Sequence, residues 1–203
     1  MTVPRATVFV VDDDEAVRRS LCLLLDSVGL ESECYDSAVA FLDAWNAEHS
    51  GCLLLDIRMP SMSGLDLQAR LTERRAALPI IFLTGHADVP LAVRAMQAGA
   101  FDFLEKPFND QELLDRVHAA LDHDARDRQR KNERREVRDR IGRLTPRERD
   151  VLELVVDGNA NKVVADSLGI SERTVEIHRA RVMTKMKADS LAHLVRLWLV
   201  ARR

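Results

Sequence analysis

The chain has 203 residues, of which 46% are hydrophobic and 31% are charged, and its formal net charge is −3. This composition is ordinary for a globular protein, the length allows two modest domains, and no apolar stretch approaches the roughly 20 residues that span a bilayer. The first five residues lack the charged and apolar regions of a signal peptide. We therefore expect a cytoplasmic protein with no membrane association.

The two parts of the chain differ in charge. Residues 1–122 carry ten Lys and Arg against twenty Asp and Glu, whereas residues 123–203 carry twenty against thirteen. Two domains are the simplest explanation, and a basic second domain favours a polyanionic partner. Solvated helix faces can produce the same imbalance, so charge alone does not identify that partner.

Residues 1–122 alternate short apolar runs with longer runs of helical periodicity. Strands that alternate with helices predict parallel βαβ units and an α/β fold. The run at 51–56 is apolar at nearly every position, as expected when helices cover both faces of a sheet. We predict a five-stranded, doubly wound parallel sheet. Its strands are expected at 7–11, 31–35, 51–56, 79–84 and 101–105, and its helices at 15–28, 37–48, 65–76, 88–98 and 110–123.

Polar residues stand where four of these strands would end. They are Asp12, Asp13, Asp56, Thr84 and Lys106. The carboxyl ends of strands in an open α/β sheet meet at one edge, so these side chains should converge. A single such residue usually caps a turn or a helix, but five in this order favour a binding site.

The chemistry of these residues suits phosphoryl transfer. A carboxylate such as Asp56 can attack phosphorus once a divalent cation relieves the crowding of negative charge. Mg²⁺ (or Mn²⁺) prefers oxygen ligands, which Asp12, Asp13 and Asp56 supply. Lys106 can neutralise one phosphoryl oxygen, while the Thr84 hydroxyl can donate a hydrogen bond to another.

Three cysteines, Cys22, Cys34 and Cys52, lie in or beside apolar runs. Their spacing contains no C-x-x-C motif, which a metal or redox site would favour. We therefore predict that all three are plain buried thiols.

Residues 123–140 consist almost entirely of Asp, Arg, Gln, Lys and Glu. Acid-before-base pairs four residues apart, such as Glu136 and Arg140, support a solvated helix. There are too few apolar positions for a sustained coiled coil. We predict a charged helical linker, and the sequence leaves open whether it bends.

Residues 141–203 predict a small all-α domain. The run Thr145-Pro146-Arg147-Glu148 combines an N-cap, a proline at the first helical position and a capping box, so a helix should begin at about 146. Further helices are expected at about 161–168, 171–187 and 189–200, with a tight turn at Gly169. The last helix contains more apolar residues, including Leu194 and Trp198, than a three-helix core can bury.

A helix, a tight turn and an Arg-rich helix form the geometry that places a recognition helix in the major groove of DNA, although an ordinary helical hairpin is the alternative. In the third helix, Val175, Val182 and Met186 recur at helical spacing and should face the core. The remaining face mixes side chains that suit phosphates, base edges and thymine methyl groups. It consists of Arg173, Glu176, Ile177, Arg179, Ala180, Arg181 and Lys185.

Two motifs accompany the strand-end residues: Met59-Pro60-x-x-x-Gly64 and Lys106-Pro107-Phe108. Together they resemble the receiver domain of two-component response regulators, with its CheY-like fold, over about residues 5–122. The resemblance implies that Asp56 accepts a phosphoryl group from a sensor histidine kinase. It also implies that Asp12, Asp13, Asp56 and the backbone carbonyl of Arg58 hold the metal.

The same resemblance implies a switch. The residues matching Thr84 and Phe103 would move together on phosphorylation and remodel the face near 88–105. The Lys106–Pro107 peptide bond would be cis. Gly85 departs from the commonest pattern, in which Ala or Ser follows the switch Thr, and this leaves the dephosphorylation rate open.

The second part is similar to the LuxR-type DNA-binding domain over about 141–203. The similarity rests on Leu144-Thr145-Pro146-Arg147-Glu148, Asn161-Lys162, Ala165, Leu168, Ile170-Ser171, Thr174-Val175 and His178. With Gly85-His86-Ala87-Asp88-Val89-Pro90 after the switch Thr, the whole chain resembles the FixJ branch of response regulators. The resemblance adds Lys162, Thr174 and His178 to the expected DNA interface, His178 as a packing or phosphate-contacting residue. It also implies that the last helix pairs two subunits.

We therefore predict a transcription regulator that is phosphorylated on Asp56, becomes a homodimer, binds promoter DNA and acts on RNA polymerase. Two alternatives remain. One is an aspartyl-phosphate hydrolase, although no catalytic residue for an external substrate is evident. The other is a phosphorylation-gated module that binds acidic proteins or RNA, which salt dependence and preference for duplex DNA would distinguish.

Overall fold

The computed structural model describes residues 6–46, 48–74, 76–85 and 89–202. The chain divides into two compact units, Met1–Asp127 and Arg128–Arg203. Among the described residues, no helix is both long and apolar enough to cross a membrane.

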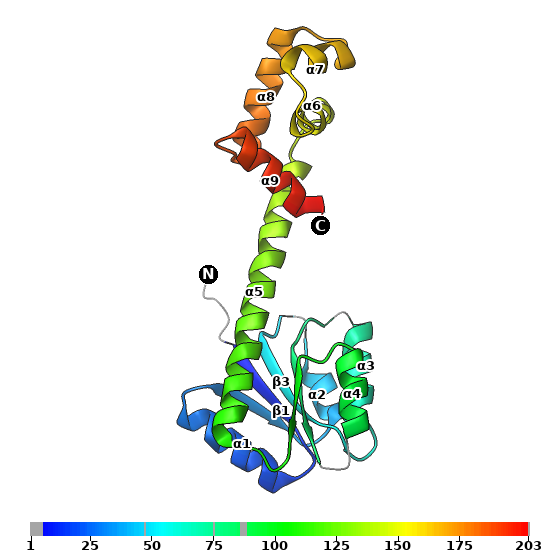
Figure 1. The fold of residues 1–203 in the computed structure, drawn as a ribbon, viewed down its shortest axis with the longest axis vertical. Coiled ribbons are helices and arrows are strands. Elements are labelled where there is room, and N and C mark those ends of the chain that lie inside the picture. Colours follow the sequence, from blue (N-terminus) through cyan, green and yellow to red (C-terminus); the bar gives the residue numbers. More distant parts are fainter. Residues whose placement is uncertain (1–5, 47, 75, 86–88, 203) are drawn as a thin grey trace. The chain divides into compact units, whose positions relative to one another are not determined.

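The first unit is a parallel sheet in the strand order β2-β1-β3-β4-β5, flanked by helices (Figure 1). All four strand pairings are parallel, which confirms the predicted five-stranded α/β fold. The strands are β1 Thr7–Val11, β2 Glu31–Tyr35, β3 Gly51–Asp56, β4 Ile80–Thr84 and β5 Asp102–Glu105. The helices are α1 Glu15–Ser27, α2 Ala38–Ala44, α3 Gly64–Glu73, α4 Val89–Gln97 and α5 Asp110–Gly142.

Each face of the sheet has its own hydrophobic core. On one face, side chains such as Phe9, Leu53 and Phe82 pack with residues of α2, α3 and α4. On the other, residues such as Val10 and Leu54 pack with α1 and the first half of α5. Because alternate side chains of a strand point to opposite faces, a strand covered on both sides must be apolar throughout. This accounts for the continuous apolar run of β3.

Most predicted elements agree with the structure to within two residues, but α2 is shorter than expected. It was predicted to reach residue 48 and ends at Ala44. Trp45 has an extended backbone (φ −74°, ψ 137°), and the Asn46 side chain accepts a hydrogen bond of 2.8 Å from the backbone N–H of Glu48. Asn side chains offer the backbone such local turns in competition with helix, which a periodic apolar pattern does not register.

The segment predicted as a linker, 123–140, is part of α5, a single helix from Asp110 to Gly142. The boundary between the two units falls inside this helix, between Asp127 and Arg128. Both units therefore use part of α5, and the segment is not a separate element.

Asp124 shows how the first unit uses its part of α5. Its side chain is buried, with 2% of the residue exposed, although the surrounding sequence predicts a solvated helix. It accepts hydrogen bonds from the backbone N–H of Gly51 (2.9 Å) and the hydroxyl of Ser50 (3.0 Å). Asp124 therefore joins α5 to the start of β3.

Replacing Asp124 by alanine is expected to destabilise the first unit by about 2 kcal/mol, because it leaves a buried N–H and a hydroxyl without their acceptor. Urea unfolding of the full chain measures this loss. Asp122→Ala is the matched control, since Asp122 lies on the same helix and is exposed. Equal losses in the two variants would contradict the anchoring role of Asp124.

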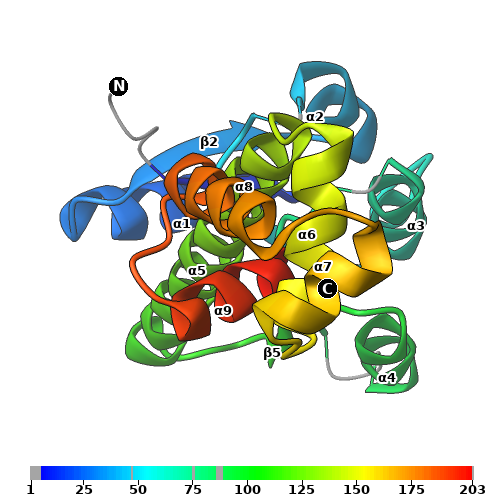
Figure 2. The same cartoon turned by 90° about the horizontal axis from the view of Figure 1, so that it is seen from above.

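The second unit consists of the end of α5 with α6 Pro146–Val156, α7 Asn161–Leu168, α8 Glu172–Met186 and α9 Leu191–Arg202. These helices surround one core, to which Val151, Val164, Val182 and Leu197 contribute. Figure 2 shows this unit from above. The predicted all-α helix-turn-helix architecture is confirmed.

The prediction that α9 leaves Leu194 and Trp198 uncovered is wrong. Leu194 is fully buried and Trp198 is 9% exposed. The end of α5 supplies the missing cover: Val137 joins the core, and the side chains of Arg134 and Arg138 donate hydrogen bonds to backbone carbonyls near the end of α9. The unit thus has five helical segments around its core.

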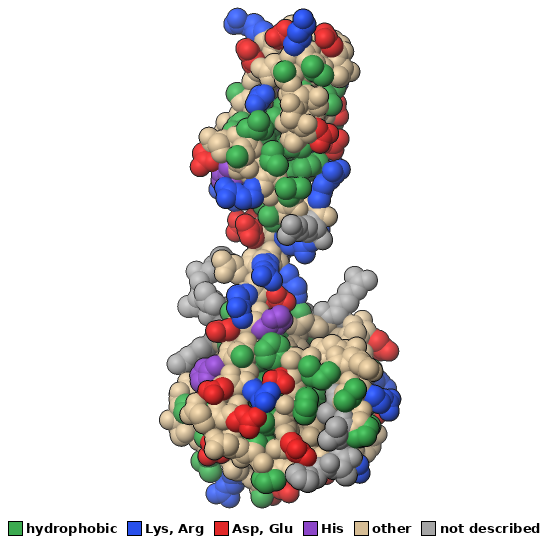
Figure 3. Space-filling model, viewed as in Figure 1, with side chains coloured by type: hydrophobic (Ala, Val, Ile, Leu, Met, Phe, Trp, Pro, Cys, Tyr) green, Lys and Arg blue, Asp and Glu red, His purple; other side chains and the backbone are tan. Residues whose placement is uncertain are grey.

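Other apolar residues of α9 do reach the surface. Leu191 is 40% exposed and Leu199 is 53% exposed. Figure 3 shows hydrophobic side chains at the surface of the second unit, with Lys and Arg around them. An apolar face therefore exists on α9, but it is made of residues other than those expected.

Glu148 of α6 is buried, with 2% of the residue exposed, and accepts hydrogen bonds from two partners. One of its carboxylate oxygens accepts hydrogen bonds from the backbone N–H of Thr145 (2.8 Å) and from the ammonium of Lys185 (2.6 Å). The first completes the predicted capping box. The second joins α6 to α8, and the bond from Lys185 is the main reason that the pKa of Glu148 is lowered.

This lowered pKa predicts acid sensitivity in the second unit. A carboxyl whose pKa is lower in the folded state contributes stability above its unfolded pKa, about 4.3 for Glu, and loses it as pH falls through the folded value. We expect Glu148→Gln to lose that contribution at pH 7 and to show a shallower decline between pH 5 and 3. Thermal unfolding across this range measures both effects. The exposed Glu153 of the same helix provides the control, Glu153→Gln, which should follow the wild type; identical behaviour of the two variants would refute the prediction.

The prediction of three buried thiols is wrong for two of the cysteines. Cys22 of α1 and Cys34 of β2 are joined by a disulfide, and Cys34 is exposed because β2 is an edge strand. Only Cys52 is a free, buried cysteine. Sequence spacing could not reveal the pair because it arises from the packing of α1 beside β2.

Candidate phosphoryl-transfer site and DNA interface

Three of the predicted strand-end residues meet at one point. The ammonium of Lys106, after β5, lies 2.7 Å from a carboxylate oxygen of Asp12, after β1, and 2.7 Å from one of Asp56, at the end of β3. The Asp12 side chain is 2% exposed, that of Asp56 14% and that of Lys106 27%. The site is therefore open to solvent on the side of Asp56 and Lys106.

Backbone groups orient both carboxylates. The second oxygen of Asp56 accepts a hydrogen bond of 2.7 Å from the backbone N–H of Arg58, and that of Asp12 accepts one of 2.9 Å from the backbone N–H of Asp14. Arg18 of α1, which no sequence pattern singled out, donates a hydrogen bond of 2.7 Å to the backbone carbonyl of Asp12. Each carboxylate thus directs one oxygen at Lys106 and the other at the backbone.

Burial and neighbouring charge have opposite effects on the pKa values of Asp56 and Lys106. Desolvation raises the pKa of Asp56, and Lys106 only partly offsets it. Desolvation also lowers the pKa of Lys106, but its hydrogen bonds to Asp12 and Asp56 outweigh this effect, so the net pKa is raised. Lys106 is therefore held as a cation between two carboxylates.

The other predicted residues surround this centre without joining it. Asp13 is exposed, Thr84 is buried at the end of β4 with 2% exposed, and Phe103 on β5 is 38% exposed. The peptide bond from Lys106 to Pro107 is cis, as expected from the family resemblance.

The donor chemistry of this edge fits a hard cation. Asp12, Asp13, Asp56 and the Arg58 carbonyl offer only oxygen, which Mg²⁺ prefers. In the part of the chain that the structure describes, no three Asp, Glu, His or Cys side chains come close enough together to hold a metal ion. Asp12 and Asp56 instead share Lys106.

The second unit presents a helix-turn-helix. Gly169 takes the left-handed conformation (φ 64°) that ends α7, a conformation that glycine adopts without a steric penalty. Ser171 caps α8 by accepting a hydrogen bond from the backbone N–H of Thr174 (3.1 Å). The predicted core residues of α8 are buried, which leaves the opposite face of the helix outward.

Five predicted DNA-facing residues of α8 are exposed: Arg173, Glu176, Ile177, Ala180 and Arg181. Lys162, near the start of α7, is exposed as well. Thr174, His178 and Arg179 are partly buried, and Arg179 donates a hydrogen bond of 2.9 Å to the side chain of Asn161. Within the described residues, the buried Nδ1 of His178 has no hydrogen-bond partner.

Lys185 differs from the other predicted DNA contacts. Its ammonium lies against Glu148 and also donates a hydrogen bond to the backbone carbonyl of Arg143 (3.3 Å). The helical period placed it on the outward face but could not reveal a buried carboxylate on another helix. The positive charge of Lys185 is therefore paired with Glu148 inside the unit.

Two family models match the chain, one for each unit. Residues 8–118 match the response regulator receiver domain, and residues 142–198 match the bacterial regulatory proteins of the luxR family. The chain is 53% identical to the transcriptional regulatory protein FixJ of Azorhizobium caulinodans, over 96% of this chain and 92% of that one. It belongs to the FixJ-type response regulators.

Other relatives of this response regulator cover nearly its whole length. Nodulation protein W of Bradyrhizobium diazoefficiens is 48% identical over 95% of this chain and 85% of its own. Among solved structures, the response regulator StyR matches with a TM-score of 0.87 and 47% identity, covering 96% of this chain and 98% of StyR. Full-length FixJ from B. japonicum matches with a TM-score of 0.61 and 42% identity, covering 98% of both chains.

The FixJ-type regulator is thus a transcriptional regulator of a two-component system, with a receiver domain and a LuxR-type DNA-binding domain. Its receiver implies a histidine kinase as partner, and its second domain implies DNA binding. The strand-end cluster belongs to the receiver, and the outward face of α8 to the DNA-binding domain.

Proposed function

We propose that Asp56 is the phosphoacceptor of this regulator and receives its phosphoryl group from a sensor histidine kinase in the cytoplasm. The single observation that carries the proposal is the placement of Asp56 at the end of β3, part-buried and paired with Lys106 at 2.7 Å. Its second oxygen is held by the backbone N–H of Arg58, so the carboxylate is fixed in orientation. A fixed nucleophile beside a cation is what phosphoryl transfer requires.

Asp12, Asp13, Asp56 and the Arg58 carbonyl would hold Mg²⁺ or Mn²⁺ at this edge. The bound ion would supply charge neutralisation for the incoming phosphoryl group. Lys106 would then neutralise the negative charge of a phosphoryl oxygen on the side of Asp56 that it already contacts. The hydroxyl of Thr84, at the end of the neighbouring strand β4, would donate a hydrogen bond to another phosphoryl oxygen.

Phosphorylation would shift a two-state equilibrium of the face near 88–105. The exposed aromatic ring of Phe103 and the exposed Val93 and Met96 lie on β5 and α4 of this face. Burying them between two receivers would stabilise the phosphorylated homodimer. The exposed Leu191 and Leu199 on α9 offer a second pairing surface in the DNA-binding domain.

The dimer would bind promoter DNA through α8 and, most simply, activate transcription through RNA polymerase. Arg173 and Arg181 would contact phosphates or guanine edges. Glu176 would accept a hydrogen bond from the amino group of cytosine, and Ile177 or Ala180 would pack against a thymine methyl group. Lys162 would contact a phosphate. Thr174, His178 and Arg179 are less exposed and would support this surface, while Lys185 is assigned to the α6–α8 ion pair.

The test is Asp56→Asn, compared with wild type after incubation with Mg²⁺ and acetyl phosphate. We expect only the wild type to gain one phosphoryl group by intact mass and to bind duplex DNA from its promoter about tenfold more tightly, a coupling of about 1.4 kcal/mol. Asp43→Asn is the control, because Asp43 is an exposed carboxylate of α2; this variant should follow the wild type.

Four outcomes would overturn parts of this proposal. Phosphoryl uptake by Asp56→Asn would move the acceptor elsewhere. Phosphoryl uptake by the wild type without any change in DNA binding would show that phosphorylation does not control DNA binding. Binding that prefers RNA or an acidic protein to duplex DNA at equal salt would favour the protein- or RNA-binding alternative, and release of phosphate from many added phosphomonoesters would favour the hydrolase.

A further inference from the structure

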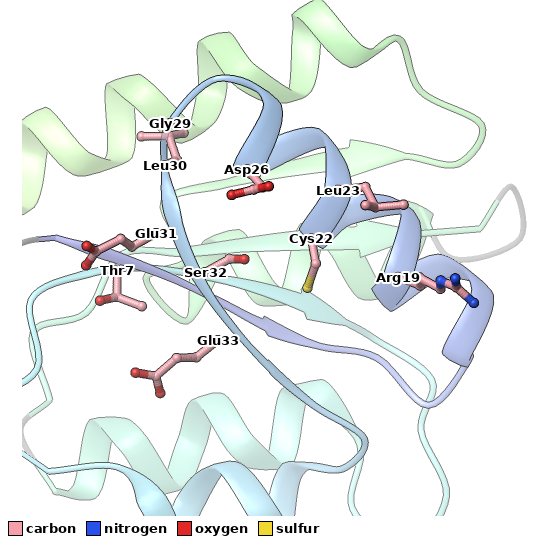
Figure 4. Close-up of a pocket in the computed structure, with 10 residues that line it drawn as sticks. All are labelled: Thr7, Arg19, Cys22, Leu23, Asp26, Gly29, Leu30, Glu31, Ser32 and Glu33. Carbon is pink, nitrogen blue, oxygen red and sulfur yellow. The ribbon is translucent and has the colours of Figure 1, made fainter.

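The disulfide between Cys22 and Cys34 joins α1 to β2, and each of these two elements contacts the backbone of Asp12. Figure 4 shows Cys22 on α1 with its sulfur directed toward the strand that carries Ser32 and Glu33. We propose that Cys22 and Cys34 form a reversible thiol–disulfide pair that responds to hydroperoxides and acts on the phosphoacceptor site through Asp12. The second half of this statement rests on the function proposed above for Asp12 and Asp56.

The connection to Asp12 runs through its own peptide groups. On the side of α1, Arg18 stands one helical turn before Cys22 and donates a hydrogen bond of 2.7 Å to the carbonyl of Asp12. On the side of β2, Tyr35 follows Cys34 directly, and its carbonyl accepts a hydrogen bond of 3.3 Å from the N–H of Asp12. The disulfide therefore closes a ring of contacts that includes the backbone of Asp12 on both sides.

Neither cysteine is fully buried, so a small oxidant can approach the pair. Cys34 is exposed on the edge strand, and Cys22 lines a pocket of about 730 Å³ between α1 and β2 (Figure 4). The third cysteine, Cys52, is fully buried in β3, and burial raises its pKa to about 12, so it is not expected to react. The chain thus contains one reactive pair and one inert thiol.

The charges of the pocket favour a neutral oxidant. Its lining includes the carboxylates of Asp26 and Glu33 and the guanidinium of Arg19. An anionic disulfide such as oxidised glutathione would meet net negative charge here, whereas hydrogen peroxide carries none. A hydroperoxide is therefore the expected oxidant class.

The chemistry is a two-electron oxidation in two steps. The thiolate of Cys22, in the pocket, attacks one peroxide oxygen, the O–O bond breaks, and a sulfenic acid and hydroxide result. The Cys34 thiol then attacks the sulfenic sulfur, the S–S bond forms, and water leaves. A cellular dithiol reverses the reaction by thiol–disulfide exchange and becomes a disulfide itself. Disulfides inside cells are mostly of this transient, responsive kind.

The bond should make the site more reactive. It restricts relative motion of α1 and β2, the two elements that hold the peptide groups of Asp12, so Asp12 is held more firmly at the edge where it would bind the proposed metal ion. Preorganised placement of catalytic groups raises reaction rates. Oxidation would therefore increase the rate of phosphoryl uptake by Asp56.

The experiment uses the full chain, reduced with dithiothreitol or oxidised with hydrogen peroxide. Reactive thiols are counted by maleimide labelling in denaturant followed by intact mass, and phosphoryl uptake from acetyl phosphate is followed in parallel. We expect oxidation to remove two of three thiols reversibly and to raise the rate of uptake about threefold. Cys22→Ser and Cys34→Ser should each abolish the change in rate, and Cys52→Ala should retain it.

Arg18→Gln separates coupling from simple stabilisation. It should still form the disulfide, shown by the loss of two thiols, but its uptake rate should no longer respond to oxidation. If the wild type keeps three thiols, the redox pair is refuted. If two thiols disappear without a change in rate, while the reduced protein is phosphorylated normally, the link to Asp12 is refuted and the proposed function of Asp56 still stands.

Discussion

Replacing Gly51 by alanine is expected to destabilise the receiver by more than about 3 kcal/mol, among the largest effects of a single substitution in this chain. Gly51 begins β3 at a φ of +139°, and a Cβ there would lie 1.8 Å from the backbone carbonyl oxygen of Thr7. Thr7 cannot move aside easily, because it pairs with Gly51 and donates its N–H to the carbonyl of Ser50. Urea unfolding monitored by circular dichroism measures the loss.

Gly29→Ala is the matched control for this prediction. Gly29 also has a positive φ, +75°, but a Cβ there would meet nothing within 4 Å. The substitution should cost only about 1 kcal/mol, the penalty for the left-handed backbone. Similar losses at the two positions would show that close approach of β1 does not constrain Gly51.

Leu194→Ala is expected to destabilise the DNA-binding domain by about 3 kcal/mol. Leu194 is fully buried among residues from α5, α6 and α8, and removing its side chain loses transfer free energy and leaves a cavity. The expected result contradicts the sequence-based view of Leu194 as a surface residue. Thermal unfolding of the full chain, followed by near-ultraviolet circular dichroism, to which Trp198 and Trp45 contribute, is the measurement.

Leu199→Ala tests the opposite side of the same helix. Leu199 is 53% exposed, so its loss should change stability by less than about 0.5 kcal/mol. In the proposed dimer it should instead weaken self-association of the phosphorylated protein, as measured by sedimentation. A larger stability loss for Leu199→Ala than for Leu194→Ala would reverse the assignment of the two faces of α9.

The sequence was most informative where topology alone decides position. Asp12, Asp56 and Lys106 could be predicted to meet because each follows a strand of one parallel sheet, and the carboxyl ends of such strands share an edge. The caps at Ser171 and Thr145 were predictable because capping acts within a few residues. In these cases the interacting groups are either local or fixed by strand order.

The sequence was least informative where a side chain finds its partner on a distant helix. Asp124 stands among charged residues, and nothing in that pattern reveals that Gly51 and Ser50 bind it. Lys185 has the spacing of a DNA contact, but Glu148 neutralises it from another helix. Cys22 and Cys34 are brought together only by packing of α1 on β2. Periodicity describes which face of a helix is apolar, not what covers it.

The placement of the unit boundary inside α5 has a consequence for how such proteins are joined. The first half of α5 carries Asp124, which serves the sheet, and the second half carries Val137, which serves the helical core. Genetic exchange of output domains would preserve both cores only when the crossover falls near Asp127 and Arg128. A crossover at residue 141, where the recognisable DNA-binding motif begins, would separate the transferred domain from the end of α5, whose Val137 belongs to its core.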